Sequence, residues 1–324
     1  MSENIFTKRR EPFTFMLYVG IGGSGLLFFV IFIIFNAKPR MIWQHYLYFL
    51  VAGFLLSLML LTKQLVYFGM GALGLILLIT IIRFSRNILS FFSYALTSAF
   101  AFFTPVLVVD LNLKLKPPYV SHIQYVLETG SQHGDKIASL GFNIWVFYTK
   151  TLFGSSHIPL QIGGLSLAPL TPFSLGYILF AILCIVLFSA FIVNIRQQNT
   201  EIQMFNSQQI VSALIFFSFI NLAFNLTLTG THERYLYHFY PFIIIACLAL
   251  IPQSRFFNHI MLTILIFSAL MYGVYLFSYL SGEVRPSNYV IIRMIAALHL
   301  SLFIYLFYSW LRNSTSQSTN LSSS

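Results

Sequence analysis

The sequence predicts an all-α membrane protein, a polytopic bundle of about nine transmembrane helices, and three observations lead to this fold class. Hydrophobic residues make up 58% of the chain and charged residues only 8%, well below the roughly 25% of soluble domains. Apolar runs long enough to cross a bilayer, about 20 residues, recur along the chain. Lysine and arginine stand singly between these runs. That pattern is typical of topology signals and lipid contacts, and it excludes a nucleic-acid surface despite the net charge of +10.

The expected spans follow one another with one long interruption. They cover 13–35, 41–61, 65–82, 88–109, 173–194, 210–228, 236–251, 259–280 and 288–311. The interruption, 110–172, is richer in polar residues, Gly and Pro, so we expect a large extracytoplasmic loop with one short surface helix at about 142–153. The last residues, 313–324, are almost all Ser, Thr, Asn and Gln, which predicts a disordered tail. Residues 1–312 are expected to form a single transmembrane domain.

Basic residues in short loops set the orientation, because they remain on the cytoplasmic side. If 110–172 is extracytoplasmic, the cytoplasmic side receives Lys38, Arg40, Arg83, Arg86, Arg196, Arg255 and Arg312. The short outer loops receive only Lys63, Arg234 and Arg285. One cluster, Lys8 to Arg10, conflicts with this pattern if 13–35 spans once. Either that first run is not a span, or Met1 is not the native start.

The strongest local signal is the segment 229–235, in which His232, Glu233 and Arg234 stand between two apolar spans. A charge at the bilayer centre costs about 2.5–3.5 kcal/mol on insertion scales, so these residues favour water or polar partners. The hydroxyl of Thr231 is expected to cap the helix that follows. The free N–H groups of that helix end, with Arg234 beside them, would suit a phosphate group.

Each candidate also has a plainer interpretation. A wet loop between spans would carry the charges, and an interfacial aromatic belt would explain Tyr235, Tyr237 and Tyr240. Lys63 is expected either to attract a phosphate or to snorkel to the membrane edge. Trp145, near Asn143 at the start of the expected surface helix, would be an interface anchor. Lone histidines such as His299 would have packing roles. No histidine pair has metal-ligand spacing, so neither a metal nor another intrinsic cofactor is expected.

Three segments, in this order, resemble the polytopic glycosyltransferases of the GT-C superfamily, which use polyprenyl-phosphate-linked sugars. The segments are 61–64, 139–145 and 229–235. The first resembles a Thr-Lys segment after an apolar run. The second resembles an Asn-Ala-aromatic-Asn-Leu-Trp element, in which Asn143 and Trp145 match and Gly141 replaces Ala. The third resembles a Thr-x-x-His-Glu-Arg-Tyr element and the His-Glu-Lys element of dolichyl-phosphate-glucose glucosyltransferases.

The resemblance implies a membrane glycosyltransferase of the hexosyltransferase type. Such an enzyme moves a sugar from a polyprenyl-phosphate donor to an acceptor at the extracytoplasmic face. It implies substrate-binding roles for His232, Glu233, Arg234, Tyr235, Lys63, Asn143 and Trp145. Its partners would be the lipid-linked sugar and membrane lipids. We expect a bacterial plasma membrane rather than an endoplasmic-reticulum membrane.

The chain departs from the family at its N-terminal side. Family members carry an acidic catalytic base in a first outer loop that precedes the three segments, and no Asp or Glu of this chain lies in such a loop. The catalytic base is therefore not identified. The chain is expected to be a fragment, a degenerate relative, or half of a split enzyme whose membrane partner supplies the missing spans. A transporter or flippase of lipid-linked sugars and a non-catalytic scaffold subunit stay open as alternatives.

Overall fold

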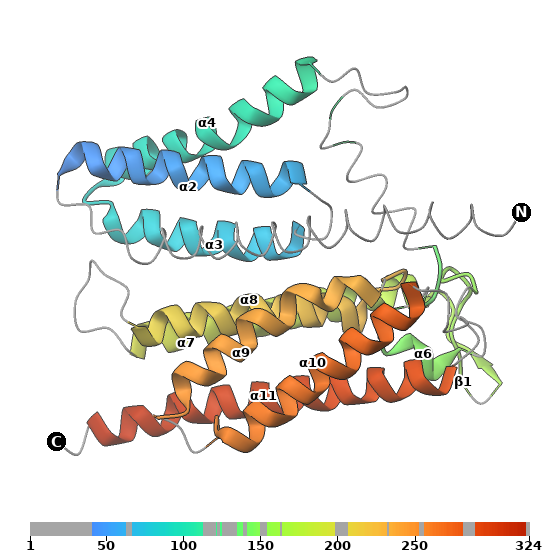
Figure 1. Ribbon diagram of the computed structural model, residues 1–324. Helices are drawn as coiled ribbons and strands as arrows, with labels where there is room; N and C mark the ends of the chain where they lie inside the picture. Colours follow the sequence, from blue (N-terminus) through green and yellow to red (C-terminus); the bar gives the residue numbers. More distant parts are fainter. Residues whose placement is uncertain are drawn as a thin grey trace, which may run out of the picture. The chain divides into compact units, whose positions relative to one another are not determined.

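The chain is predominantly helical wherever the computed structural model describes it (Figure 1). The described residues are 41–62, 67–112, 121, 124, 135–138, 141–149, 154–162, 164–197, 207–231, 233–252, 256–280 and 289–321. They belong to two compact units, 1–128 with 200–205, and 129–199 with 206–324. Each unit is described by itself, so the single domain expected from the sequence stays a prediction.

Three apolar helices form the described part of the first unit. They are α2 (Ile42–Thr62), α3 (Tyr67–Phe84) and α4 (Ile88–Asn112). α2 lies against α4 where Gly53 meets Ser98, so closely that a Cβ on Gly53 would overlap the backbone carbonyl of Ser98. The Ser98 hydroxyl donates across the same contact to the Phe49 carbonyl, over 3.1 Å. Small residues are what allow membrane helices to approach each other in this way.

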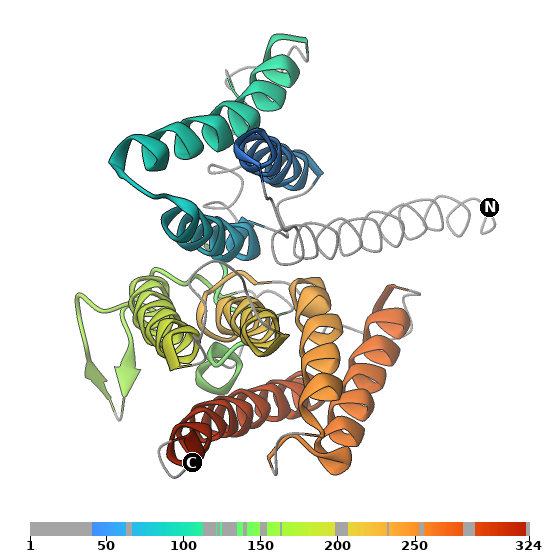
Figure 2. The ribbon, with the colours of Figure 1, turned by 90° about the vertical axis from the view of Figure 1, so that its left-hand side faces the viewer.

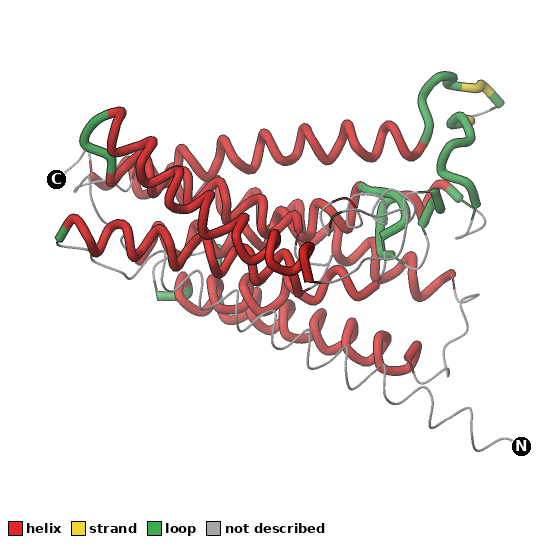
Figure 3. Tube along the Cα trace, turned by 90° about the horizontal axis from the view of Figure 1, so that it is seen from above, coloured by secondary structure: helices red, strands yellow, loops and turns green. Residues whose placement is uncertain are grey.

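The second unit contains the remaining helices and a small hairpin. In chain order these are α6 (Trp145–Tyr148), β1 (Gln161–Ile162), β2 (Leu165–Ser166), α7 (Pro172–Gln197), α8 (Ser207–Thr227), the 3₁₀ helix η2 (Glu233–His238), α9 (Phe239–Leu250), α10 (His259–Leu280) and α11 (Tyr289–Leu321). The two strands pair antiparallel, and the turn uses the positive φ of Gly164 (+86°), which glycine adopts without steric cost. Figure 3 shows this hairpin beyond the N-terminal end of α7.

α8 is the central helix of the second unit. It packs against α7, η2, α9 and α11, and Figure 2 shows it end-on between α7 and α9. In an apolar 18-residue stretch of each helix, 89% of the residues of α8 are buried, compared with 33% in α7 and 28% in α10. The end of α8 is therefore the place where polar backbone groups most need partners inside the protein.

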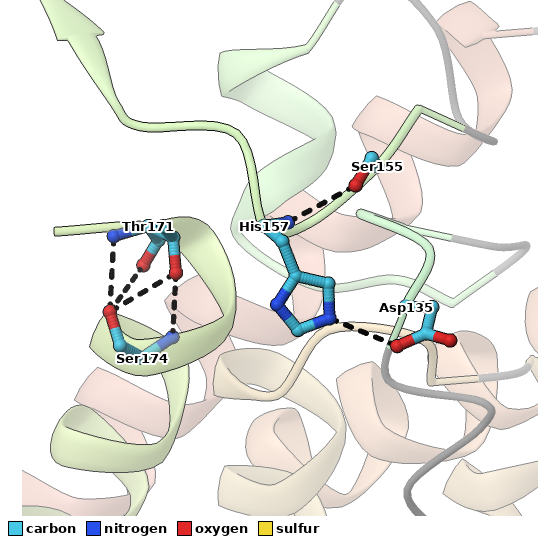
Figure 4. A network of polar contacts seen from close by, with 5 residues as sticks. All are labelled: Asp135, Ser155, His157, Thr171 and Ser174. Carbon is cyan, nitrogen blue, oxygen red and sulfur yellow. Dashed lines mark hydrogen bonds and ion pairs between the residues drawn. The ribbon is translucent and has the colours of Figure 1, made fainter. Parts of the chain in front are cut away.

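Two helices begin with the same reciprocal cap, in which residue N-cap and residue N3 exchange hydrogen bonds. At α7, the Thr171 hydroxyl accepts from the Ser174 N–H (3.2 Å), and the Ser174 hydroxyl accepts from the Thr171 N–H (3.0 Å) (Figure 4). At α4, Asn87 and Ser90 make the matching pair, at 2.8 and 3.1 Å. Each pair satisfies two N–H groups that a helix start leaves free. Pro172 follows at the first helical position, where its missing N–H costs nothing.

Every predicted span from residue 41 onward coincides with an apolar helix, and the all-helical class is confirmed apart from the small hairpin. Among the residues that the structure describes, six helices are long and apolar enough to cross a membrane: α2, α4, α7, α8, α10 and α11. α3 and α9 are apolar but shorter. The predicted span 13–35 lies outside the described residues. The count of nine spans and the extracytoplasmic side of 110–172 therefore stay predictions.

Two local predictions differ from the structure. The short helix expected at 142–153 covers only Trp145–Tyr148, because Thr149 turns to an extended conformation (φ −93°, ψ 148°) and ends it. The tail expected to be disordered from residue 313 continues α11 as far as Leu321. Extending an existing helix avoids the unfavourable nucleation step, so polar residues of modest helix propensity can follow an apolar span.

The close contact between α2 and α4 predicts an asymmetry between two glycines of the first unit. Gly53→Ala should destabilise the protein by about 1–3 kcal/mol, because the added methyl group forces the two backbones apart. Gly71→Ala in α3 is the matched control, since a Cβ there meets nothing within 4 Å and alanine favours a helix. Thermal unfolding in detergent, followed by helical circular dichroism, measures both. Equal midpoints for the two variants would contradict the close contact.

Candidate functional site

The C-terminal end of α8 is closed by a segment that precedes it by more than 80 residues. The last carbonyl groups of a helix have no partner within the helix. Here they accept hydrogen bonds from three consecutive residues: Ile144 N–H to Leu226 O (2.9 Å), Trp145 Nε1–H to Thr227 O (2.6 Å) and Asn143 Nδ2–H to Leu228 O (3.1 Å). This end of α8 leads directly into 229–235, so the second and third segments of the family resemblance, 139–145 and 229–235, come together here.

Thr231 completes this closure from the other side. Its hydroxyl accepts a hydrogen bond from Asn143 Nδ2 at 3.0 Å and donates to the Asn225 carbonyl at 3.3 Å. Gly230, with φ of +67°, turns the chain out of α8 just before it, as left-handed residues do at helix ends. We call Asn143, Ile144, Trp145 and Thr231 the α8 cap. Thr231 was expected to cap the following helix, but its described hydrogen bonds run back to α8 and to Asn143.

Two glycines make room for the α8 cap. A Cβ on Gly141 would overlap the carbonyl and hydroxyl oxygens of Thr231. On α7, a Cβ on Gly176 would come within 2.7 Å of the Thr227 carbonyl and 3.5 Å of Trp145 Nε1. The position at which the family element has Ala thus lacks space for a methyl group in this chain, so the replacement by glycine has a steric reason.

The segment that follows the α8 cap is a 3₁₀ helix. η2 covers Glu233–His238 and continues directly into α9. The phosphate site was predicted at the N-terminus of a regular α-helix near residue 232, and the described backbone has a six-residue 3₁₀ helix in that place, with α9 beginning only at Phe239. His232 and the side chains of Glu233, Arg234 and Tyr235 lie outside what the structure describes. Their predicted contacts with a substrate stay predictions.

The structure gives Asn143 and Trp145 an architectural role. Their residues are 0% and 5% exposed, so Trp145 is not the interface anchor of the plainer interpretation. Its only N–H donor outside the backbone is used by the Thr227 carbonyl. In the described part of the chain, Asn143 Oδ1 is buried without a hydrogen-bond partner. Lys63 lies outside the described residues, so its place relative to this end of α8 is not given.

Arg293 of α11 holds the residues that follow the α8 cap, and its role was not predicted from the sequence. Its Nε donates to the Val146 carbonyl (2.9 Å) and its NH2 to the Thr149 carbonyl (3.0 Å). Both carbonyls belong to α6 and its C-cap, so the guanidinium group ties α11 to the residues just after Trp145. The available signal was an arginine inside an otherwise apolar predicted span, because such a residue needs polar partners.

His157, in the loop between α6 and α7, contacts both Asp135, which precedes α6 (Figure 4), and Phe173 at the start of α7. His157 Nε2 lies 2.9 Å from Asp135 Oδ1, and the His157 ring lies 4.6 Å from the Phe173 ring, centroid to centroid. Both polar side chains are exposed, so their pairing contributes little to stability. Within the described ranges, no three side chains of His, Cys, Asp or Glu gather as a metal site.

Comparisons with protein-family models, with curated proteins and with solved structures found no match to this chain. The family resemblance therefore still depends on the three sequence elements alone.

The α8 cap predicts that one tryptophan is structurally far more important than another. Trp145→Phe should destabilise the protein by about 1–3 kcal/mol, because the buried Thr227 carbonyl loses its donor. Trp43→Phe is the control: Trp43 is 58% exposed, and among the described residues its Nε1 contacts the Met41 sulfur, so its effect should stay within about 0.5 kcal/mol. Thermal unfolding in detergent compares them. A Trp145 variant as stable as the Trp43 variant would argue against the cap.

Proposed function

We propose that the protein is a membrane glycosyltransferase, or the C-terminal part of one. It would transfer a sugar from a polyprenyl-phosphate-linked donor to an acceptor hydroxyl at the extracytoplasmic face. One observation carries the proposal: two elements that resemble the same enzyme family, 139–145 and 229–235, meet within the α8 cap, where Asn143 of the first donates a hydrogen bond to the hydroxyl of Thr231 in the second. Two chance likenesses would have no reason to meet in space.

The positions of the basic residues along the second unit support the proposal that the α8 cap faces the extracytoplasmic side of the membrane. α7 and α11 begin, and α8 ends, at the end of the unit that carries the α8 cap (Figure 1). The opposite end of these helices carries Arg196 in the last turn of α7 and Arg312 in α11, and the connection from α9 to α10 contains Arg255. Basic residues favour the cytoplasmic side. The α8 cap would then face outward, as the resemblance implies.

The proposed reaction is a displacement at the anomeric carbon of the sugar. The acceptor oxygen forms a bond to that carbon, and the bond from the carbon to the phosphate oxygen breaks. The lipid phosphate leaves with the electron pair, and the acceptor proton passes to a base, which in such reactions is usually a carboxylate. Within this chain no residue is assigned as that base.

The leaving phosphate gains negative charge, so it needs donors that are already in place before the reaction. Arg234 is the group we assign to this task, because a guanidinium binds phosphate with two parallel hydrogen bonds. Glu233 would orient Arg234 through an ion pair, and His232 would donate a further hydrogen bond. Tyr235 completes the proposed donor site.

Reconstitution in liposomes tests the reaction class directly. The purified protein is mixed with radiolabelled polyprenyl-phosphate mannose or glucose and with membrane-extract acceptors, and the label that leaves the lipid is counted. Transfer of the label supports the proposal. Movement of intact donor across the bilayer without transfer would replace it by a transporter. Neither activity, together with co-purification of a membrane partner, would favour a scaffold subunit.

Substituting one arginine should weaken recognition of the donor phosphate. Arg234→Ala should weaken binding of a polyprenyl-phosphate sugar about ten- to hundredfold, the equivalent of a charge-assisted hydrogen bond of roughly 1.5–3 kcal/mol. Arg196→Ala, an exposed arginine in the last turn of α7, should bind as tightly as the unaltered protein. Native mass spectrometry with titrated lipid measures both. Unchanged binding by the Arg234 variant would refute the assignment.

A further inference from the structure

Three side chains from three different helices form a buried hydrogen-bonded network in the second unit. The Tyr240 hydroxyl of α9 lies 2.7 Å from the Ser268 hydroxyl of α10 and 2.6 Å from His299 Nε2 of α11. His299 Nδ1 lies 2.7 Å from the carbonyl of Ile295, four residues earlier in α11. The three residues are 5%, 1% and 0% exposed. The plainer interpretations, an aromatic belt for Tyr240 and packing alone for His299, do not explain these contacts.

The partners fix the direction of each hydrogen bond. A backbone carbonyl only accepts, so His299 Nδ1 carries the proton that it shares with Ile295 O. In the uncharged ring, Nε2 is then an acceptor, and the Tyr240 hydroxyl must donate to it. The hydroxyl of Ser268 is left to donate to the Tyr240 oxygen. The network is closed, and removal of any member would leave a buried group without its partner.

Phe142, which precedes the α8 cap in the chain, packs against His299 of this network. The Phe142 ring lies nearly parallel to the His299 ring, with centroids 5.8 Å apart and an angle of 18°. Tyr272 and Tyr275 of α10 contact its edges, at centroid distances of 6.1 and 5.2 Å. Phe142 is 0% exposed. Asn143 follows it directly, so the position of His299 governs where the α8 cap can form.

Tyr240 lies after the segment 232–235 in the chain. It is the second residue of α9, which continues from η2 without a break. Described contacts therefore anchor Thr231 on one side of this segment and the start of α9 on the other. Before it, Asn143 binds Thr231, and after it, Tyr240 binds α10 and α11.

We infer that Tyr240 and His299 are positioning residues, which hold the α8 cap and the start of α9 in place and so support binding of the donor phosphate at the site proposed above. This inference rests on the proposed function for the identity of the ligand. Neither side chain would touch the substrate. Their effect would pass through Phe142 and Asn143 on one side and through η2 on the other.

The test measures local order and phosphate binding in the same variants of the full-length chain. Hydrogen exchange, read by mass spectrometry in detergent, follows the backbone amides of 141–149, where the Ile144 N–H is bonded to the Leu226 carbonyl. The affinity for undecaprenyl phosphate, compared with that for the uncharged undecaprenol, reports on the proposed donor site. The variants are Tyr240→Phe, His299→Gln and His299→Leu. The control is Tyr305→Phe, which removes a hydroxyl from a tyrosine of α11 that is 45% exposed.

Tyr240→Phe should speed exchange in 141–149 and weaken undecaprenyl phosphate binding, each by about tenfold, with little change in α7. His299→Gln retains an acceptor for Tyr240 and should lie closer to the unaltered protein than His299→Leu. The control should match the unaltered protein.

Three results would overturn the inference. Unchanged exchange in 141–149, or exchange that rises equally in all helices of the unit, removes the positioning role and leaves the proposed function intact. Faster exchange with unchanged phosphate binding also removes it. An unaltered protein that binds undecaprenyl phosphate no better than undecaprenol rejects the proposed function, and the assignment of the ligand falls with it.

Discussion

The second unit depends on how the carbonyl groups at the end of α8 are satisfied. α8 is the most deeply buried of the apolar helices, and a buried carbonyl without a donor is costly in free energy. Asn143, Ile144 and Trp145 supply the donors. The neighbouring features follow from that need. Gly141 and Gly176 lack the side chains that would overlap the α8 cap. Arg293 donates hydrogen bonds to the carbonyl groups of Val146 and Thr149. Phe142 packs against Tyr275 of α10 and His299 of α11.

The contacts at the end of α8 involve two residues, Asn143 and Trp145, that also belong to the proposed glycosyltransferase elements. In the family resemblance, Asn143 and Trp145 appear as substrate-binding residues. In this chain their side chains donate hydrogen bonds to the end of α8 and to Thr231, and these contacts account for their burial. A donor site needs groups held in place before the substrate arrives, because preorganised hydrogen-bond donors stabilise developing charge most strongly. The hydrogen bond from Asn143 to Thr231 fixes the described start of 229–235 against the end of α8.

Much of the fold was predictable because apolar runs of about 20 residues have few alternatives to helices in a membrane. The site was predictable only in its parts. The elements at 139–145 and 229–235 stood out in the sequence, but the hydrogen bond that joins them links residues 88 positions apart, and no local pattern encodes such a pairing. Arg293 was overlooked because it lies inside an apolar run. The short length of α6 depends on Thr149, whose extended conformation has no strong local signal.

The closure of α8 has a consequence for biosynthesis. The ribosome makes 141–145 before α7 and α8, so the donors exist well before the carbonyls that they bind. They can meet only after two further helices have been inserted. Meanwhile α8 carries amide and hydroxyl groups into the bilayer, but Ser218, Asn221 and Thr227 each donate to the carbonyl one turn earlier in their own helix. α8 thus enters with much of its polarity already masked, and its final turn is the part that must wait for the rest of the chain.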